Sequence, residues 1–435
     1  MAQQSLLAAV SGIQANQTYL DEVANNIANV NTVGYKAGSV QFQDLLSQQL
    51  SGASAPAANG TSGGINPVAI GSGVRVGSNQ LNLSEGTLMQ TGQNTDVAIN
   101  GNGYLVVEQG GQQLYTRNGS LTMDANGNLV TQGGGIVQGW PAGASASTPI
   151  GAITIPQNQS NPAQPTSNVT ISGNLPSWDG TGTAPTLTKT VDTYDALGNV
   201  VPLTLTFTAQ TPTGTAPSIT AYNWKVTGTY GSATTPTFTE NLSFKPNGTL
   251  ATPAASTASS TTTPPTDPYS FLVGDPNLPS TGGTAAQINL SFASSTGTNG
   301  VTGYAGASSI AVTQNGYASG SLSNFSIGAD GTITGSFSNG QTLALGQIAL
   351  ANFANPAGLT DQGAGNFAAS PNSGQPQVGV AGTGGRGQLL GGELEQSNVN
   401  LGTELTNLIN AQEAYTANTK VLTATNVTIQ ALEAV

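Results

Sequence analysis

Few side chains in this sequence have the types and spacing that catalysis needs. The 435 residues include no cysteine and no histidine, which excludes disulfides, thiolate nucleophiles, histidine-ligated metals and every Ser-His-Asp triad. Asp192 and Asp195 could form a pair of carboxylates for general acid–base work. Their setting, a polar segment just before an alternating strand pattern, is more typical of a turn. We therefore expect no catalytic residue and no enzymatic activity.

Two short motifs resemble ligand-binding loops. Residues 382–387, Gly-Thr-Gly-Gly-Arg-Gly, match the G-x-G-x-x-G pattern of dinucleotide-binding loops. No clear strand precedes them, and Gly391 and Gly392 interrupt any helix that could follow. Residues 124–128, Asp-Ala-Asn-Gly-Asn, match part of a calcium-binding loop, but no glutamate follows at the required spacing. A type I′ hairpin turn is the better interpretation, so we expect no cofactor and no metal.

Composition limits the possible partners. Charged residues make up only 6% of the chain, against about 25% in an average soluble protein, and the formal net charge is −12. The 8 basic residues are scattered, whereas binding to nucleic acid phosphates requires them to cluster. No apolar run reaches the roughly 18 residues of a membrane-spanning helix, and the first residues lack the features of a cleavable secretory signal. We expect no nucleic acid partner, no membrane insertion and no signal cleavage.

Apolar residues recur every seven positions near the start of the chain, and a second row follows three residues further along. The two rows are Leu6, Ile13, Leu20 and Ile27, and Ala9, Asn16, Val23 and Val30. Such an a/d heptad pattern predicts a helix that pairs with another helix. Asn29, Asn31 and Gly34 are typical helix-ending residues and predict where this helix stops.

The C-terminal end repeats the pattern. Its row of residues spaced by seven is Leu394, Leu401, Leu408, Tyr415, Leu422 and Ile429. Asn398 and Asn400 are both candidate N-caps, and Glu404 lies near the positive end of the expected helix. At ~1.5 Å per residue, its ~35 residues would span roughly 50 Å. We expect the two terminal helices to pair as a coiled coil.

The outer faces of both predicted helices carry little charge. Residues 1–35 contain only Asp21 and Glu22 as charged side chains. A solvated coiled coil places Glu and Lys at flanking positions, whereas small uncharged residues suit contact on all sides, as in a polymer. An ordinary intramolecular coiled coil is the alternative interpretation. Because such helices are marginal alone, we expect them to be disordered before assembly.

The sequence between the helices is typical of short strands joined by turns. It accounts for most of the 58 glycines and 23 prolines of the chain. Residues 201–208 alternate between apolar and polar side chains and predict a half-buried strand. Residues 51–64 predict a linker, and residues 209–218 and 251–268 are of low complexity. The fold class is therefore mainly β with terminal α-helices.

Residues 25–36, Asn-Asn-Ile-Ala-Asn-Val-Asn-Thr-Val-Gly-Tyr-Lys, resemble the N-terminal signature of the bacterial flagellar rod and hook proteins. Residues 392–400 and 408–422 resemble its C-terminal partner, and residues 91–140 are similar to the β domain of the same family. The signature positions are Asn25, Asn26, Asn29, Asn31, Thr32, Gly34, Tyr35, Lys36, Ser397, Asn398, Gln412, Tyr415 and Asn418.

Within this family, residues 190–208 and 320–359 are similar to the hook members, and distal rod members are considerably shorter. The resemblance implies discontinuous domains, with a β-rich middle domain that carries an inserted outer β domain. They are an inner helical polymerisation domain of residues 1–30 and 398–435, a connecting segment of residues 31–70, a middle β domain of residues 71–150 and 312–397, and an outer β domain of residues 151–311.

The resemblance also implies the function. Copies of the chain would self-assemble into a curved tubular polymer outside the cell, a universal joint that transmits torque from rod to filament. Its partners would be further copies, the distal rod protein, the hook cap, the hook–filament junction proteins and the flagellar type III export apparatus. The alternatives are a distal rod subunit and a secreted β-rich carbohydrate-active enzyme or adhesin. The last would need a cleavable signal and a carboxylate pair in a cleft.

Overall fold

The computed structural model describes most of the chain and divides it into two compact units. The described residues are 2–55, 63–144, 148–156, 160–214, 217–231, 236–252, 270–274, 287–292 and 300–433. Part of the predicted linker (56–62) and most of the low-complexity stretch (253–268) lie outside the described residues. The first unit comprises residues 1–157, 324–335 and 342–435, and the second comprises residues 158–323 and 336–341.

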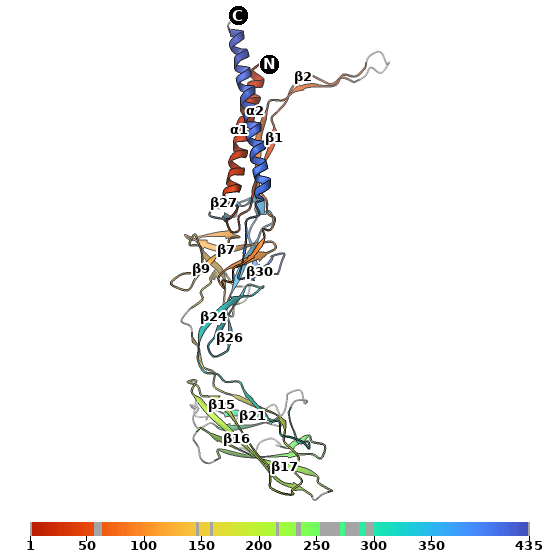
Figure 1. Cartoon of the computed structure of the whole chain (residues 1–435), viewed down its shortest axis with the longest axis vertical. Coiled ribbons are helices and arrows are strands. Elements are labelled where there is room, and N and C mark those ends of the chain that lie inside the picture. Colours follow the sequence, from red (N-terminus) through yellow and green to blue (C-terminus); the bar gives the residue numbers. More distant parts are fainter. Residues whose placement is uncertain are drawn as a thin grey trace. The chain divides into compact units, whose positions relative to one another are not determined.

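Strands fill the chain between two terminal helices, which confirms the predicted fold class. Helix α1 spans Ala2–Ala28 and helix α2 spans Leu401–Glu433. The two helices pack along one another in opposite directions, so that both chain ends lie near the same end of the pair (Figure 1). The first unit contains this pair together with a β-sheet, so the expected division into an inner and a middle domain remains a prediction.

Both predicted heptad rows extend past the helices, and the structure corrects them there. Leu394 lies in strand β31 (Glu393–Glu395), where it is buried and pairs with Met89. The helix begins later because Asn400 caps it: the side-chain Oδ1 accepts the N–H of Thr403 at 3.2 Å. Val30 lies in the turn after α1, not in the helix. Heptad spacing alone does not detect such capping contacts.

An extended β-hairpin, here called the arm, follows α1. It consists of β1 (Gly38–Asp44), β2 (Gln48–Ser51), β3 (Val68–Ile70) and β4 (Val74–Leu81). β1 pairs with β4 beside α1, and β2 pairs with β3 where the arm leads away from the helices (Figure 1). The expected boundary between residues 70 and 71 therefore falls inside one hairpin.

The rest of the first unit is an antiparallel sheet in the order β26-β11-β7-β8-β28-β27, with two short flanking pairs, β30–β6 and β31–β5. The strands, besides β31, are β5 (Leu88–Gln90), β6 (Val97–Asn100), β7 (Tyr104–Gln109), β8 (Gln112–Thr116), β9 (Leu121–Met123), β10 (Leu129–Thr131), β11 (Ile136–Pro141), β12 (Gly151–Ala152), β26 (Thr342–Asn352), β27 (Thr360–Gly363), β28 (Asn366–Ala368), β29 (Gln377–Val380) and β30 (Gln388–Gly391). A 3-10 turn, η1, spans Pro356–Gly358. Buried aromatic rings pack in the core on this sheet. The rings of Tyr115 and Phe353 meet edge to face, with their centroids 4.8 Å apart.

In its described part, the second unit contains two five-stranded sheets. One has the strand order β15-β16-β17-β18-β19. In the other, β14 pairs with β21, β22 and β23, and β20 pairs with β21. The strands of this unit are β13 (Ser160–Asn161), β14 (Asn168–Asn174), β15 (Thr186–Tyr194), β16 (Val200–Thr213), β17 (Ala221–Tyr230), β18 (Phe238–Phe244), β19 (Leu250–Thr252), β20 (Ser270–Gly274), β21 (Gln287–Ser291), β22 (Val301–Thr302) and β23 (Ala311–Gln314). β24 (Gly320–Ile327) and β25 (Thr332–Phe337) contain residues of both units. The predicted strand 201–208 is confirmed within β16, which also includes the first residues of the stretch 209–218.

One apolar core lies between the two sheets of the second unit. β16 contributes Leu203, Leu205 and Phe207, which alternate with threonines that face away from the core. Trp224 and Phe244 enter the same core from β17 and β18. The alternation sets the register of β16, because a shift by one residue would bury the threonines.

Replacing Phe207 with Ala should therefore destabilise the second unit by about 3–5 kcal/mol, since the fully buried ring would leave a cavity. Hydrogen exchange measured by mass spectrometry checks this prediction. Exchange should become faster in β15–β18 and should not change in the sheet around β26. Thr206→Ala, on the opposite face of the same strand, is the matched control and should change the free energy of unfolding little. Equal losses from both variants would contradict the assigned core.

Candidate assembly site

The chain passes three times through the base of the helix pair. Residues 29–38 leave α1, residues 82–87 return from the arm, and residues 393–400 lead into α2. Backbone hydrogen bonds join these passes: the N–H of Gly34 donates to the carbonyl of Glu395 at 2.8 Å. We call these three segments the junction. It contains or borders ten of the thirteen signature positions, all except those within α2.

Asn26 sets the direction in which the chain leaves α1. Its side chain is buried, and its Nδ2 donates to the carbonyl of Gly38 at 2.8 Å while its Oδ1 accepts the N–H of Gly38 at 2.9 Å. This paired bond imitates a strand partner for the first residue of β1. The amide thus connects the last turn of α1 to the start of the arm.

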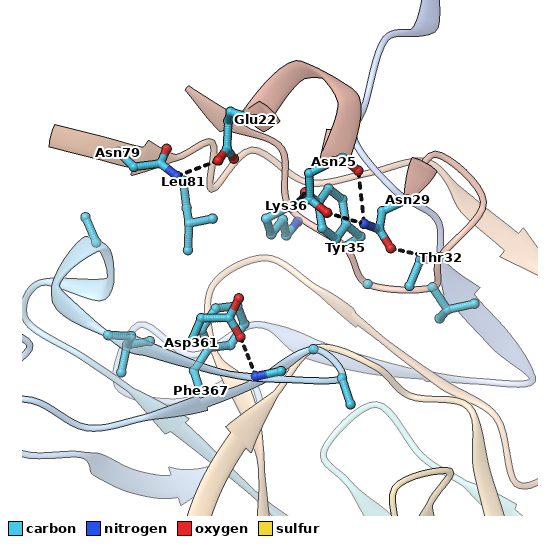
Figure 2. A pocket seen from close by; sticks show the side chains of 17 residues that line it. Glu22, Asn25, Asn29, Thr32, Tyr35, Lys36, Asn79, Leu81, Asp361 and Phe367 are labelled. Carbon is cyan, nitrogen blue, oxygen red and sulfur yellow. Dashed lines mark hydrogen bonds between the residues drawn. The ribbon is translucent and has the colours of Figure 1, made fainter. Parts of the chain in front are cut away.

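A chain of polar side chains continues from Asn26 along the end of α1. The hydroxyl of Tyr35 donates a hydrogen bond to Asn26 Oδ1 at 3.1 Å and accepts one from Asn25 Nδ2 at 3.3 Å. Asn29 Nδ2 donates to Asn25 Oδ1 at 3.0 Å, and Thr32 Oγ1 donates to Asn29 Oδ1 at 3.0 Å. Figure 2 shows Asn25, Asn29 and Thr32 joined in this way. The signature therefore encodes a specific turn after α1.

Gly34 is needed in that turn for two reasons. Its φ of +70° lies in the left-handed region that L side chains rarely adopt. A Cβ at this position would also lie 2.8 Å from the backbone of Arg117. The close approach brings the turn onto the sheet of the first unit.

Two further signature residues secure the segment before α2. Asn398 Oδ1 accepts the N–H of Ala37 at 2.8 Å, and its Nδ2 donates to the carbonyls of Asn82 and Ser84. Asn398 therefore links all three passes of the junction and is not the helix cap. Ser397 Oγ accepts the N–H of Val399 at 3.3 Å.

An ion triad occupies the centre of the junction. Lys36 Nζ lies 2.5 Å from Glu395 Oε1, and Arg117 Nη1 lies 3.2 Å from Glu395 Oε2. The Glu395 side chain is 0% exposed, and its Oε1 also accepts the N–H of Gly86. Lys36 donates to the carbonyl of Ser84. Burial lowers the pKa of Lys36, although the contact with Glu395 opposes that shift.

A cavity of about 510 Å³ with both polar and apolar lining lies beside the junction, between the end of α1 and the β27–β28 hairpin (Figure 2). Tyr35 and Glu22 line it from the helix side, and Asp361 and Phe367 face them from the hairpin. Burial raises the pKa of Tyr35 to about 12, and the carboxylates of Glu22 and Asp361 add to this shift. Among the described residues, no group of three or more acidic side chains is placed to hold a metal ion.

The two predicted heptad rows of α1 differ in burial. Ala9 and Val23 of the second row are among the most buried side chains of the helix, together with Ala15 and Asn26, whereas the first row of Leu6, Ile13, Leu20 and Ile27 is half-buried. Small residues at the contact bring the helices close: a Cβ at Gly12 would lie 2.9 Å from the side chain of Asn418. The larger apolar row is thus only partly covered within one chain.

On α2 the predicted heptad row is also only partly covered by the rest of the chain. Leu408, Tyr415, Leu422 and Ile429 are half-buried, and Leu401 at the first turn is exposed. Of the signature positions on this helix, Asn418 contacts α1, Tyr415 is half-buried and Gln412 is exposed. No helix among the described residues is long and apolar enough to cross a membrane.

The motifs considered for chemistry have structural places. Asp195 closes the turn between β15 and β16, where its Oδ1 accepts the N–H of Leu197 and of Asn199, whereas Asp192 lies within β15. Residues 382–387 form a turn between two strands, β29 and β30, and no helix follows them. Asp195 is therefore engaged in a turn, and residues 382–387 lack the strand–loop–helix context of a dinucleotide-binding loop.

The hairpin predicted at residues 124–128 is confirmed, but its turn type is not. β9 and β10 pair across it, with Met123 opposite Leu129. Only Gly127 has a positive φ there, whereas a type I′ turn needs two such residues. Asp124 instead accepts the N–H groups of Asn126 and Asn128 with its Oδ1.

The fold and the junction define a class of protein: a β-rich chain whose two terminal helices pair with one another. Family models agree along the chain. Residues 6–36 match the flagella basal body rod protein model, residues 98–174 the flagellar hook protein FlgE/F/G D1 domain, residues 179–317 the flagellar basal body protein FlaE D2 domain, and residues 390–434 the flagellar basal body rod FlgEFG protein C-terminal model.

Individual relatives narrow the class. The chain is 34% identical to the flagellar hook protein FlgE of Borreliella burgdorferi, with 98% of each chain covered, and 35% identical to that of Escherichia coli K12, with 95% of each covered. The crystal structure of Helicobacter pylori flagellar hook protein FlgE2 has a TM-score of 0.50 at 14% identity, and covers 69% of this chain and 98% of its own. The chain belongs to the flagellar hook protein family, as a structural subunit of the hook type rather than the distal rod type.

Sequence reasoning missed several residues of the junction. Glu395 and Arg117 were not singled out, although both lie within segments that resemble the family. The available signal was the charge itself, because in a chain with 6% charged residues a Glu or Arg that is buried on folding needs a partner. Ser84 and Gly86 contact the ion triad through backbone atoms, which residue type does not reveal.

Replacing Asn26 with Ala should lower the free energy of unfolding of the first unit by about 2–3 kcal/mol. The buried N–H and carbonyl of Gly38 would both lose their partner. Urea titration with far-UV circular dichroism measures the loss. The exposed Asn31→Ala is the control, and a similar loss in both variants would contradict the assigned role of Asn26.

The raised pKa of Tyr35 predicts that the junction loses stability at alkaline pH. Its pKa is about 12 in the folded chain against an ordinary value of 10.0. Because the folded value is the higher one, the stabilisation is complete below about pH 10 and disappears as the pH rises through about 12. Urea titrations across this range, with Tyr35→Phe for comparison, measure it. An identical pH dependence in both proteins would show that Tyr35 does not contribute.

Proposed function

We propose that copies of this chain polymerise through their terminal helices into the curved tubular hook of a bacterial flagellum. The observation that carries the proposal is the uncovered apolar surface of the helix pair. Leu7 is 63% exposed, Ile409 55% and Val427 64%, although each lies in a helix that already has a partner. A second copy would cover such residues, whereas an ordinary two-helix coiled coil would place charged side chains there.

The arm offers a second apolar surface. Leu46 is 90% exposed, and Leu50, Ile65 and Val68 along the far part of the arm are also exposed. Neighbouring subunits are the natural cover for these side chains in a polymer. We propose that the helix pair forms the inner layer of the tube, the β-sheet of the first unit the middle layer, and the second unit the outer layer.

The proposed function includes further steps. The chain would leave the cell unfolded through the flagellar type III export apparatus, assemble beneath the hook cap on the distal rod protein, and carry the hook–filament junction proteins. The absence of cysteine supports this route, because no cross-link can form in the exported chain. The polymer would bend by repacking weakly charged neighbours while transmitting torque. We propose a structural role without catalysis and prefer it to the enzyme or adhesin alternative, because the relatives are named as hook proteins and Asp195 serves the turn between β15 and β16.

Like charges on the partly covered heptad row should prevent this assembly. In a Leu6→Glu, Ile13→Glu double variant the carboxylates would lie against apolar contacts of neighbouring subunits, so only monomer should remain in sedimentation and negative-stain electron microscopy. Gln17→Glu, an exposed change on the same helix, is the control for added charge and should form curved tubes. Deleting residues 251–268 should also leave assembly intact.

Cells test the same proposal in place. A strain that lacks the gene for this chain should lose its filaments and regain them on complementation. Straight assemblies of the purified protein would contradict the proposed curved tube. Normal tubes from the double glutamate variant, or unchanged motility in the deletion strain, would refute polymerisation through the helices.

A further inference from the structure

The ion pairs in the described part of the chain all converge on one carboxylate. Glu395 forms ion pairs with both Lys36 and Arg117, and each of these three side chains is at most 6% exposed. The group carries two positive charges and one negative charge away from water. Its cations are partly balanced by dipoles, since Lys36 also contacts the carbonyl of Ser84 and Arg117 that of Gly101.

The three ionised residues come from segments that are far apart in the sequence. Lys36 and Glu395 are separated by 359 positions, yet they meet where α1 ends and α2 begins. Arg117 belongs to the sheet side of the junction, and its guanidinium lies 5.6 Å above the ring of Tyr104 in β7. The triad therefore connects both terminal segments to the sheet.

We propose that Glu395 is a positioning residue that docks both termini on the sheet in the free monomer, before any polymer forms. The helices above it need such a base, because their small and hydroxylated residues make them marginal alone. Closing the long loop once, at the triad, gives the two helices the proximity of a helical hairpin. The ordered base and the less stable helix tips are then separate parts of one assembly element.

A buried ion pair suits this role better than an apolar contact. Its net contribution to stability is small, but a wrongly docked segment would leave charges buried without partners, which is costly. Glu395 therefore selects one docking register for residues 34–37 against residues 395–398. The N–H of Gly34 and the N–H of Gln396, both hydrogen bonded across the junction, report on that register.

Hydrogen exchange of the full-length monomer tests the proposal without requiring assembly, so its failure and that of the proposed polymer are distinguishable. Peptides that include Gly34, Gly86 and Gln396 should be protected in the unmodified monomer. In Glu395→Gln, which leaves two cations against a neutral amide, their exchange should be at least about 100-fold faster. Glu393→Gln, two residues away in the same strand and outside the triad, should leave it unchanged.

A second variant keeps the test decisive if Glu395→Gln unfolds the whole first unit, which the emission of the buried Trp140 would reveal. Lys36→Met leaves the Arg117–Glu395 pair intact and should raise exchange in the same peptides about tenfold, with Trp140 still buried. The proposal is overturned if these peptides are unprotected in the unmodified monomer. It is equally overturned if neither variant alters their exchange.

Discussion

The carboxylate of Glu395 has no contact with water, and both ends of the chain are arranged around it. Its two oxygens accept hydrogen bonds from Lys36, Arg117 and the N–H of Gly86. The segment after α1, the segment that returns from the arm and the segment before α2 must therefore all be in place together. Ions buried in this way tolerate little displacement, since a shift that breaks one contact leaves a charge unpaired at low dielectric. The direction of the helix pair relative to its sheet follows from this constraint.

The helices show the opposite design. Their contact includes Gly12, which lies against Asn418, and the larger apolar side chains of the first heptad row are only half-buried. A single chain thus holds its helices by close backbone approach, while leaving the surface that contributes most hydrophobic stabilisation for neighbours. Strong binding within the chain and strong binding between chains would compete for the same side chains, and the half-burial of the first heptad row leaves part of that surface available to neighbours.

The sequence predicted the elements better than their contacts. Two terminal helices, the strand within residues 201–208 and the hairpin at Asp124 follow from local periodicity and turn chemistry, which depend on neighbouring residues alone. Leu394 was assigned to the wrong element because its heptad spacing continues into β31, where pairing with Met89 overrides the local pattern. The signature asparagines were recognisable, yet the role of Asn26 depends on Gly38 and that of Asn398 on Ser84, contacts that only the folded chain creates.

The division between an ordered base and marginal helices would suit the proposed route of export and assembly. A chain exported unfolded would carry no preformed helix pair, and once outside it would have to present both helices in one direction to the growing end. Docking at Glu395 and Asn398 would supply that direction from side chains that fold with the sheet. The helix tips, with exposed Leu7 and Val427, would gain most of their stability only from neighbouring copies. Premature polymerisation would then be limited by the cost of ordering the tips, and assembly at the growing end would offset that cost.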